Sequence, residues 1–195
     1  MGKLSNAKVF GGIGAILMLV GGFIPFAQMI LPIIGLVLLF VAVKYIADET
    51  KDGIIFRNYL LYFVCTIIAF IALIAGLIIT IGGIGIMSEL KGELSDMDAI
   101  LSFLGGIMAS FIVFWILLII GTVYLRKSYN NIAKHTKVSL FRTTGTVYFI
   151  GAITLIIFIG ALILLIAKIL EIVAFFSLPD NLPAPKETIE SEIIS

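Results

Sequence analysis

Long uncharged segments alternate with short polar connectors along this chain. The uncharged segments are Val9–Val43, Asn58–Ser88, Ala99–Leu125 and Thr143–Ala167. A helix needs about 20 mostly apolar residues to cross the hydrocarbon core of a bilayer. The last three segments therefore each predict one spanning helix, at residues of about 58–82, 100–125 and 145–170.

The first uncharged segment is too long for one spanning helix and only just long enough for two. Its middle holds Gly21, Gly22, Pro25, Gln28 and Pro32. Glycine pairs and prolines interrupt helical hydrogen bonding and mark turns. We expect a helical hairpin with spans at about 9–23 and 29–46. The alternative is one long kinked helix, because membrane helices tolerate proline.

Composition places the chain in a membrane. Hydrophobic residues make up 61% of its 195 residues and charged residues only 13%, against about 45–50% and 25% in soluble domains. A water-soluble fold of this size could not bury that much apolar surface, so the lipid bilayer is the expected solvent. The net charge of +1 excludes a typical nucleic-acid-binding protein, which carries a basic face.

The distribution of lysine and arginine supports the hairpin. With five spans, ten basic residues fall on the side of the N-terminus and of the connectors 44–57 and 126–142: Lys3, Lys8, Lys44, Lys51, Arg57, Arg126, Lys127, Lys134, Lys137 and Arg142. Lys91, Lys168 and Lys186 fall on the other side. Positive residues concentrate in cytoplasmic loops. We therefore predict a multi-pass protein of the cell membrane with a cytoplasmic N-terminus, five spans and an external C-terminus.

The apolar character of the fifth span continues past Lys168 and Glu171 to Leu178. These two charges are three residues apart and share one helix face. One interpretation is an overlong helix whose end passes through the outer interface, where the lysine reaches water. The other is a buried ion pair in a pathway. The position near the helix end favours the first. Residues 179–195, with three prolines and several acids, predict a flexible acidic tail.

Two polar connectors are similar in sequence. Ile46–Arg57 and Ile132–Arg142 both read Ile-Ala-x-x-Thr-Lys, then a spacer, then Phe-Arg. The pattern predicts an internal parallel repeat of helix, connector and helix, with units at about 29–85 and 100–170. The basic residues could simply hold the connectors at anionic headgroups. The functional interpretation is a cytoplasmic docking surface formed by Thr50, Lys51, Phe56, Arg57, Thr136, Lys137, Phe141 and Arg142.

Small residues recur four apart in the apolar segments. Such pairs let helix backbones approach closely in lipid. We expect the helix–helix contacts at three pairs, Gly11 with Ala15, Ala72 with Gly76, and Gly105 with Ala109.

Residues for catalysis or metal binding are scarce. His135 is the only histidine and Cys65 the only cysteine, so neither a histidine metal site nor a redox pair can form. The serine motif Gly-x-Ser-x-Gly is absent, and the glycine clusters lack the context of a nucleotide site. We predict no catalytic, cofactor-binding or metal-ligating residue and no cofactor, and an enzyme is not expected.

The segments Ala7–Ile16, Val43–Thr50 and Ile55–Tyr59 resemble an archaeal family of uncharacterised integral membrane proteins, domain-of-unknown-function family 996. The resemblance implies a multispan membrane protein and brings no activity, cofactor or site residue. The predicted fold is an all-α polytopic membrane bundle of about five helices. The leading function is a non-enzymatic scaffold or complex subunit that docks membrane or cytoplasmic partners. The alternative is a passive channel or carrier for a small neutral solute, and homo-oligomers are compatible with either.

Overall fold

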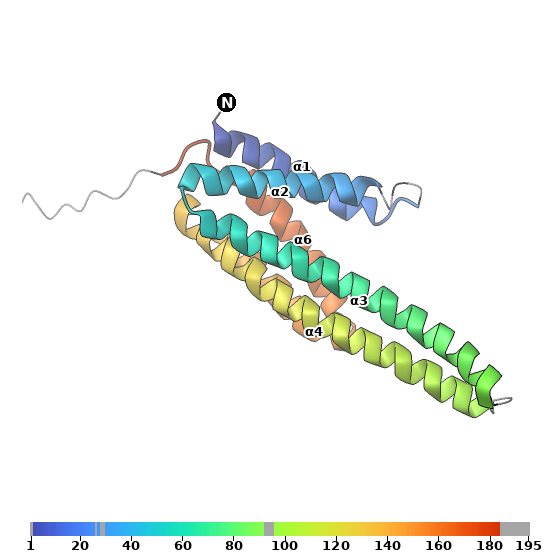
Figure 1. Cartoon of the computed structure of the whole chain (residues 1–195). Coiled ribbons are helices and arrows are strands. Elements are labelled where there is room, and N and C mark those ends of the chain that lie inside the picture. The colour runs from blue at the N-terminus through green and yellow to red at the C-terminus, as the bar shows by residue number, and fades with distance from the viewer. Residues whose placement is uncertain (1, 26, 28–29, 92–95, 184–195) are drawn as a thin grey trace, which may run out of the picture.

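The protein is an all-helical bundle of three antiparallel hairpins (Figure 1). The computed structural model describes residues 2–25, 27, 30–91 and 96–183. The helices are α1 (Lys3–Gly21), α2 (Ile30–Thr50), α3 (Gly53–Lys91), α4 (Asp96–Thr136), α5 (Ser139–Thr154) and α6 (Ile159–Phe176), with the short 3-10 helix η1 (Leu155–Ile157) between the last two. Within the described residues, six α-helices are long and apolar enough to cross a membrane, as expected for a polytopic membrane protein.

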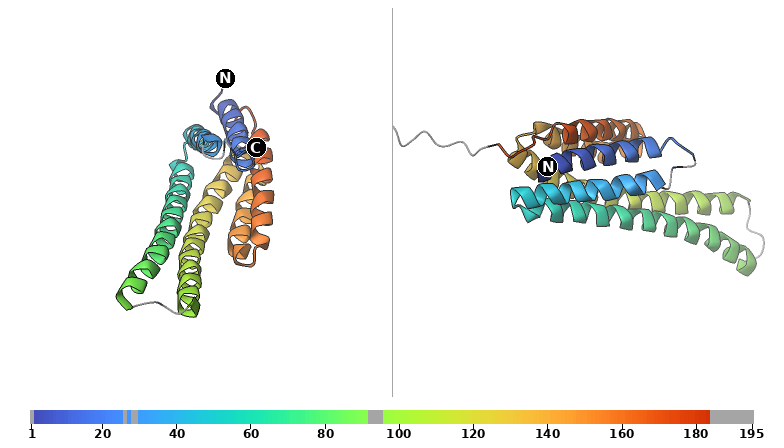
Figure 2. Two further views of the ribbon diagram at one scale, coloured as in Figure 1. Left: turned by 90° about the vertical axis from the view of Figure 1, so that its right-hand side faces the viewer. Right: turned by 90° about the horizontal axis from the view of Figure 1, so that it is seen from above.

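The three hairpins differ greatly in length. α3 and α4 have 39 and 41 residues, or roughly 60 Å each at 1.5 Å per residue. The helices of the α1–α2 and α5–α6 hairpins have 16 to 21 residues. The α3–α4 hairpin therefore projects well past the other two (Figures 1 and 2). Large apolar side chains such as Ile78 and Met108 are 64% exposed along it, as expected for a surface that faces lipid.

Residues 9–43 form two helices rather than one kinked helix. α1 ends at Gly21, α2 begins at Ile30, and the two pack side by side. The closest approach joins Gly14 and Gly35. A Cβ atom on Gly14 would lie 2.6 Å from the Gly35 carbonyl oxygen, and one on Gly35 would lie 2.5 Å from the Gly14 carbonyl oxygen. The two backbones are in contact because neither residue has a side chain.

A single span over residues 145–170 is wrong. α5 stops at Thr154, η1 follows, and Phe158 takes the left-handed conformation with φ 61°. The chain then returns along α5 as α6. Gly160 allows the tight reversal, because a Cβ there would overlap backbone atoms of Gly151 and Leu155. The part of the chain that the structure describes consequently has six membrane-competent helices where five were predicted.

The returning α6 brings the two ends of the described chain together. Gly2 lies against the backbone carbonyl of Asp180, at the end of the bundle that also holds the α2–α3 and α4–α5 turns (Figure 2). We call this the connector end. Residues 2 and 180 therefore lie at the same end of the bundle, an arrangement that disagrees with an external C-terminus opposite a cytoplasmic N-terminus, and the orientation of the termini stays a prediction. Most of the predicted tail, residues 184–195, lies outside the described residues.

The core lies at the connector end, where all three hairpins meet. Its centre is aromatic: the Tyr129 ring stacks on Tyr59 at 6.4 Å between centroids and meets Phe141 edge-on at 5.5 Å. Phe175 of α6 closes the cluster at 5.1 Å from Phe141. Such edge-to-face pairs stabilise a core beyond the area they bury. Gly11 of α1 lies against Phe175 with no room for a side chain, so α1 and α6 are in close contact.

Candidate functional site

A buried carboxylate lies beside the aromatic core. The Glu171 side chain on α6 is only 3% exposed. One of its oxygens accepts a hydrogen bond from the Tyr129 hydroxyl. The other accepts from the Tyr148 hydroxyl at 3.0 Å and from the Lys168 ammonium at 2.6 Å. Three donors from α4, α5 and α6 thus satisfy the carboxylate, which compensates for its loss of water.

Lys168 lies one helical turn before Glu171 and forms the other half of the ion pair. Its side chain is 16% exposed. Besides Glu171, its Nζ lies 3.4 Å from the sulfur of Met18 on α1. An ammonium has three N–H donors, and a thioether is a weak acceptor. Within the described part of the chain, Glu171 therefore supplies Lys168 with its one strong acceptor.

The ion pair corrects the preferred interpretation from sequence. Lys168 and Glu171 do not protrude at an outer interface, because α6 turns back and carries them into the protein at the connector end. Tyr129, Tyr148 and Met18 were missed as site residues. Five of the six tyrosines, Tyr45, Tyr59, Tyr62, Tyr129 and Tyr148, belong to or pack on this core. The signal available in the sequence was this set of tyrosines on otherwise apolar helices.

A groove of about 430 Å³ opens beside Lys168. Five helices contribute to its walls. Its polar side chains are Tyr62, Thr66, Thr122, Tyr148 and Lys168, and its apolar lining comes from Met18, Leu19, Phe70, Leu118, Ala161, Leu164 and Leu165. A second cavity of about 330 Å³ shares four of these residues, Met18, Tyr62, Thr66 and Phe70. The two spaces adjoin across those shared side chains, and the second is lined otherwise by apolar residues of α2 and α3.

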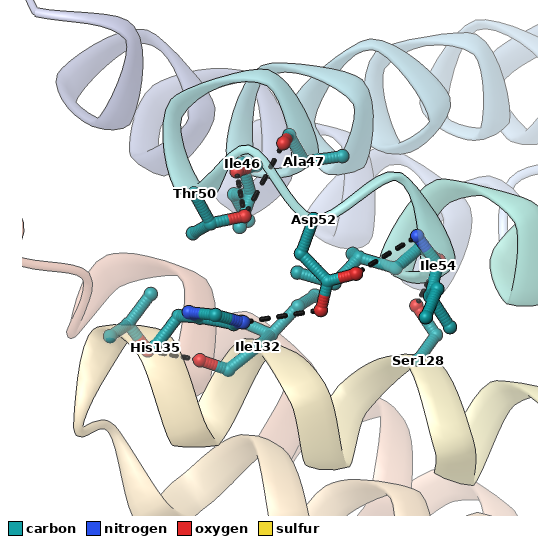
Figure 3. A network of polar contacts seen from close by, with 10 residues as sticks. Ile46, Ala47, Thr50, Asp52, Ile54, Ser128, Ile132 and His135 are labelled. Atoms are coloured by element: carbon teal, nitrogen blue, oxygen red, sulfur yellow. Dashed lines mark hydrogen bonds and ion pairs between the residues drawn. The ribbon is translucent and has the colours of Figure 1, made fainter.

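The two predicted connectors lie side by side at the connector end (Figure 3). The Asp52 carboxylate lies 3.1 Å from Nε2 of His135, and its other oxygen accepts a hydrogen bond from the Ile54 backbone at 3.0 Å, which caps the start of α3. Beneath them, the buried Ser128 hydroxyl donates to the Ile55 carbonyl at 2.8 Å. The Asp52–His135 pair thus joins the α2–α3 turn to the C-terminal end of α4.

The eight residues predicted to form the docking surface divide by exposure. Four basic side chains are exposed: Lys51, Arg57, Lys137 and Arg142. Thr50 and Phe56 are half-buried, whereas Thr136 is 3% exposed and Phe141 fully buried. Phe141 is therefore unavailable as a surface anchor, because it packs between Tyr129 and Phe175.

The two turns share local geometry. The Thr50 hydroxyl bonds the Ile46 carbonyl and the Thr136 hydroxyl bonds the Ile132 carbonyl, both at 2.8 Å. The lysine that follows has φ 54° at Lys51 and 61° at Lys137. The helices that follow the turns differ, since α3 has 39 residues and α5 has 16. The internal repeat of whole units remains a prediction.

Some of the six residues predicted to form helix–helix contacts lie at such contacts, and others do not. Gly11 and Ala15 are buried, Gly76 lies against Ser110, and Ala72 is half-buried. Gly105 has no atom within contact distance of a Cβ built on it, and Ala109 is exposed. The contact face of α4 instead carries Gly106, which lies against Thr80, and Ser110. The predicted register of the α4 contact is therefore wrong by one residue.

Trp115 lies in the middle of α4. Its indole N–H donates to the Ala152 carbonyl at 2.8 Å and joins α4 to α5. Among the described residues, no three His, Cys, Asp or Glu side chains group closely enough to hold a metal ion.

Comparison with known proteins identifies the family. Residues 31–169 match the family described as "Protein of unknown function (DUF996)". Over 184 residues, 92% of this chain and 96% of the relative, the chain is 38% identical to the uncharacterized protein MJ1644 of Methanocaldococcus jannaschii. No solved structure matches. The chain belongs to the DUF996 family.

Proposed function

We propose that this DUF996 protein is a non-enzymatic membrane subunit that docks an acidic partner protein at its connector end. The docking surface, here called the connector face, consists of the exposed Lys51, Arg57, Lys137 and Arg142 with the half-buried Thr50 and Phe56. Exposed positive charge attracts acidic partners and accelerates their association.

The contact between Asp52 and His135 carries this proposal. It joins the α2–α3 turn to the α4–α5 turn at 3.1 Å, and the buried Ser128–Ile55 hydrogen bond holds α3 against α4 directly below. The short distance between the two turns supports our inference that their basic side chains form one preorganised surface. Preorganisation lowers the entropic cost of binding.

The connector face is proposed to be cytoplasmic. Lys3 and Lys8, both connectors and the described C-terminal residues all lie at the same end of the bundle. Short loops rich in lysine and arginine face the cytoplasm. In the five-helix topology Lys168 lay on the opposite side of the membrane. With six helices it does not, so the excess of basic residues on the side of the connectors becomes larger.

The test is cross-linking in native membranes followed by mild-detergent purification and mass spectrometry. We expect a stoichiometric partner cross-linked at Lys51, Lys134 or Lys137, and loss of that partner in the double variant Arg57→Ala, Arg142→Ala. The matched control is Lys3→Ala, Lys8→Ala, which removes the same charge at the same end but on α1. Retention of the partner by a normally inserted Arg57→Ala, Arg142→Ala protein would remove the connector face as the docking site.

A second candidate function, binding of a neutral solute within the membrane, is favoured by the groove beside Lys168. Hydroxyl groups and one ammonium line that groove in an otherwise apolar region. Ionisable residues within membrane helices commonly mark binding sites and pathways. Solute binding at the groove and docking at the connector face use different residues and can be tested separately.

A further inference from the structure

Lys168 has more hydrogen-bonding capacity than the described residues satisfy. One carboxylate oxygen of Glu171 accepts from it at 2.6 Å, and the remaining neighbour is the thioether of Met18 at 3.4 Å. The Lys168 side chain is 16% exposed, and with one oxygen acceptor its three-donor ammonium can still donate to water or to a ligand. The groove lies where another acceptor could approach, because Lys168, Met18 and Tyr148 all line it.

The charges of Lys168 and Glu171 favour a ligand whose acceptor atom is uncharged. Glu171 accepts three hydrogen bonds, from Tyr129, Tyr148 and Lys168, and the bond from Lys168 is an ion pair of 2.6 Å between opposite charges. The pair of Lys168 and Glu171 is therefore electrically neutral. An anion bound beside it would add an unpaired charge in a medium of low dielectric constant, which is costly. A carbonyl or hydroxyl oxygen would accept from Lys168 without that cost.

The groove and the adjoining cavity together have the shape and lining that fit an elongated, mostly apolar molecule. The polar end of the groove, at Lys168, lies about 12 Å from the C-terminal end of α6 at 1.5 Å per residue. The adjoining cavity of about 330 Å³ reaches Ile74 of α3 and Pro32 and Ile33 of α2. Ile74 is roughly 30 Å along α3 from the connector end. Polarity thus decreases from the connector end toward the α1–α2 tip, as it does along an amphiphile in one leaflet.

We propose that the groove binds a neutral membrane amphiphile, with a carbonyl- or hydroxyl-bearing head at Lys168 and its hydrocarbon chain along Met18, Tyr62, Thr66 and Phe70. This proposal names the ligand class for the second candidate function and rests on that candidate, not on partner docking. Monoacylglycerols and long-chain alcohols are simple members of this class.

The test uses photoaffinity labelling of the purified protein in phosphatidylcholine nanodiscs. The probe is a monoacylglycerol with a diazirine in its acyl chain, and the comparison probes are the fatty acid and the alkylamine with the same chain. We expect saturable labelling of peptides that contain Met18, Thr66 or Phe70, strongest for the monoacylglycerol. No partner protein is present, so the outcome does not depend on docking at the connector face.

Two variants with a matched control locate the site. Ala161→Phe fills the groove two helical turns from the ion pair and should abolish the saturable labelling while leaving Glu171 and Lys168 in place. Leu162→Phe is the control, since Leu162 is 65% exposed and does not line the groove. Lys168→Met should weaken apparent affinity by about tenfold, as expected for a lost hydrogen bond to a charged group.

The proposal is overturned by any of three results. Labelling that spreads evenly over the lipid-facing surface of α3 and α4 would show ordinary lipid contact. Equal saturable labelling in Ala161→Phe and Leu162→Phe would place the probe outside the groove. Stronger saturable labelling by the fatty acid than by the monoacylglycerol would contradict a neutral head group and assign an anion to Lys168.

Discussion

The Tyr148 hydroxyl donates a hydrogen bond to the Glu171 carboxylate at 3.0 Å, between α5 and the helix that returns along it. The Lys168 ammonium binds the same carboxylate oxygen at 2.6 Å. This contact exists only because the chain reverses between residues 154 and 159. The buried charge, the groove and the position of the C-terminal residues all depend on that reversal.

Removal of one partner of the buried ion pair should destabilise the protein strongly. Glu171→Leu leaves the Lys168 ammonium without its carboxylate and the hydroxyls of Tyr129 and Tyr148 without their acceptor. A loss of about 3–5 kcal/mol is expected for a broken buried pair. Thermal unfolding in a mild detergent measures it.

The double variant Lys168→Met, Glu171→Leu serves as the control for that experiment. It removes both charges, and apolar replacements of buried pairs are often nearly neutral. We expect it to be markedly more stable than Glu171→Leu alone. If the single and double variants unfold at the same temperature, the ion pair does not stabilise this part of α6.

Glycine in the α5–α6 reversal should be irreplaceable. Gly160→Ala forces a Cβ into backbone atoms of Gly151 and Leu155, so the hairpin must open or shift. Gly105→Ala introduces the same methyl group on α4 where nothing lies within 4 Å. It should be neutral or stabilise by up to about 1 kcal/mol, because alanine favours helix over glycine. The melting temperature should therefore fall for Gly160→Ala and stay the same or rise for Gly105→Ala, and equal destabilisation of the two variants would contradict the reversal.

The two ends of the described chain should be accessible from the same side of the membrane. Lys3 and Ser177 are exposed at the connector end. Lys3→Cys and Ser177→Cys, each in a Cys65→Ser background, should react with a membrane-impermeant maleimide in vesicles of one orientation and be protected together in vesicles of the other. Reaction of the two cysteines from opposite sides of the membrane would contradict this expectation and indicate an odd number of spans.

Asp52 should contribute more to stability than its partner His135. Asp52→Ala removes both the backbone cap of α3 and the contact with His135, and loss of a cap typically costs about 1 kcal/mol. His135→Ala removes only a pair whose histidine is 40% exposed, and exposed pairs contribute about 0–1 kcal/mol. Chemical unfolding of the two variants compares these losses. A larger effect of His135→Ala would mean that the interhelical pair outweighs the cap.

The connector sequences could be interpreted locally because their geometry is local. The Thr50 and Thr136 hydroxyls bond carbonyls four residues earlier, and the lysines that follow turn the chain. Phe141 was misplaced because its burial depends on Phe175, 34 residues later on a helix whose direction the sequence left undetermined. The hydrogen bonds from Tyr129 and Tyr148 to Glu171 could not be predicted for the same reason.

The sequence by itself determined that the chain is a helical membrane protein, where the uncharged helices lie and that residues 9–43 contain a hairpin. These properties follow from composition and from glycine and proline, which act on the nearest few residues. Only the tertiary structure decided that residues 139–176 form the α5–α6 hairpin. No proline or charge marks that turn. It depends on close contact between Gly160 and the backbone of α5, and contact between distant residues is not encoded in local hydrophobicity.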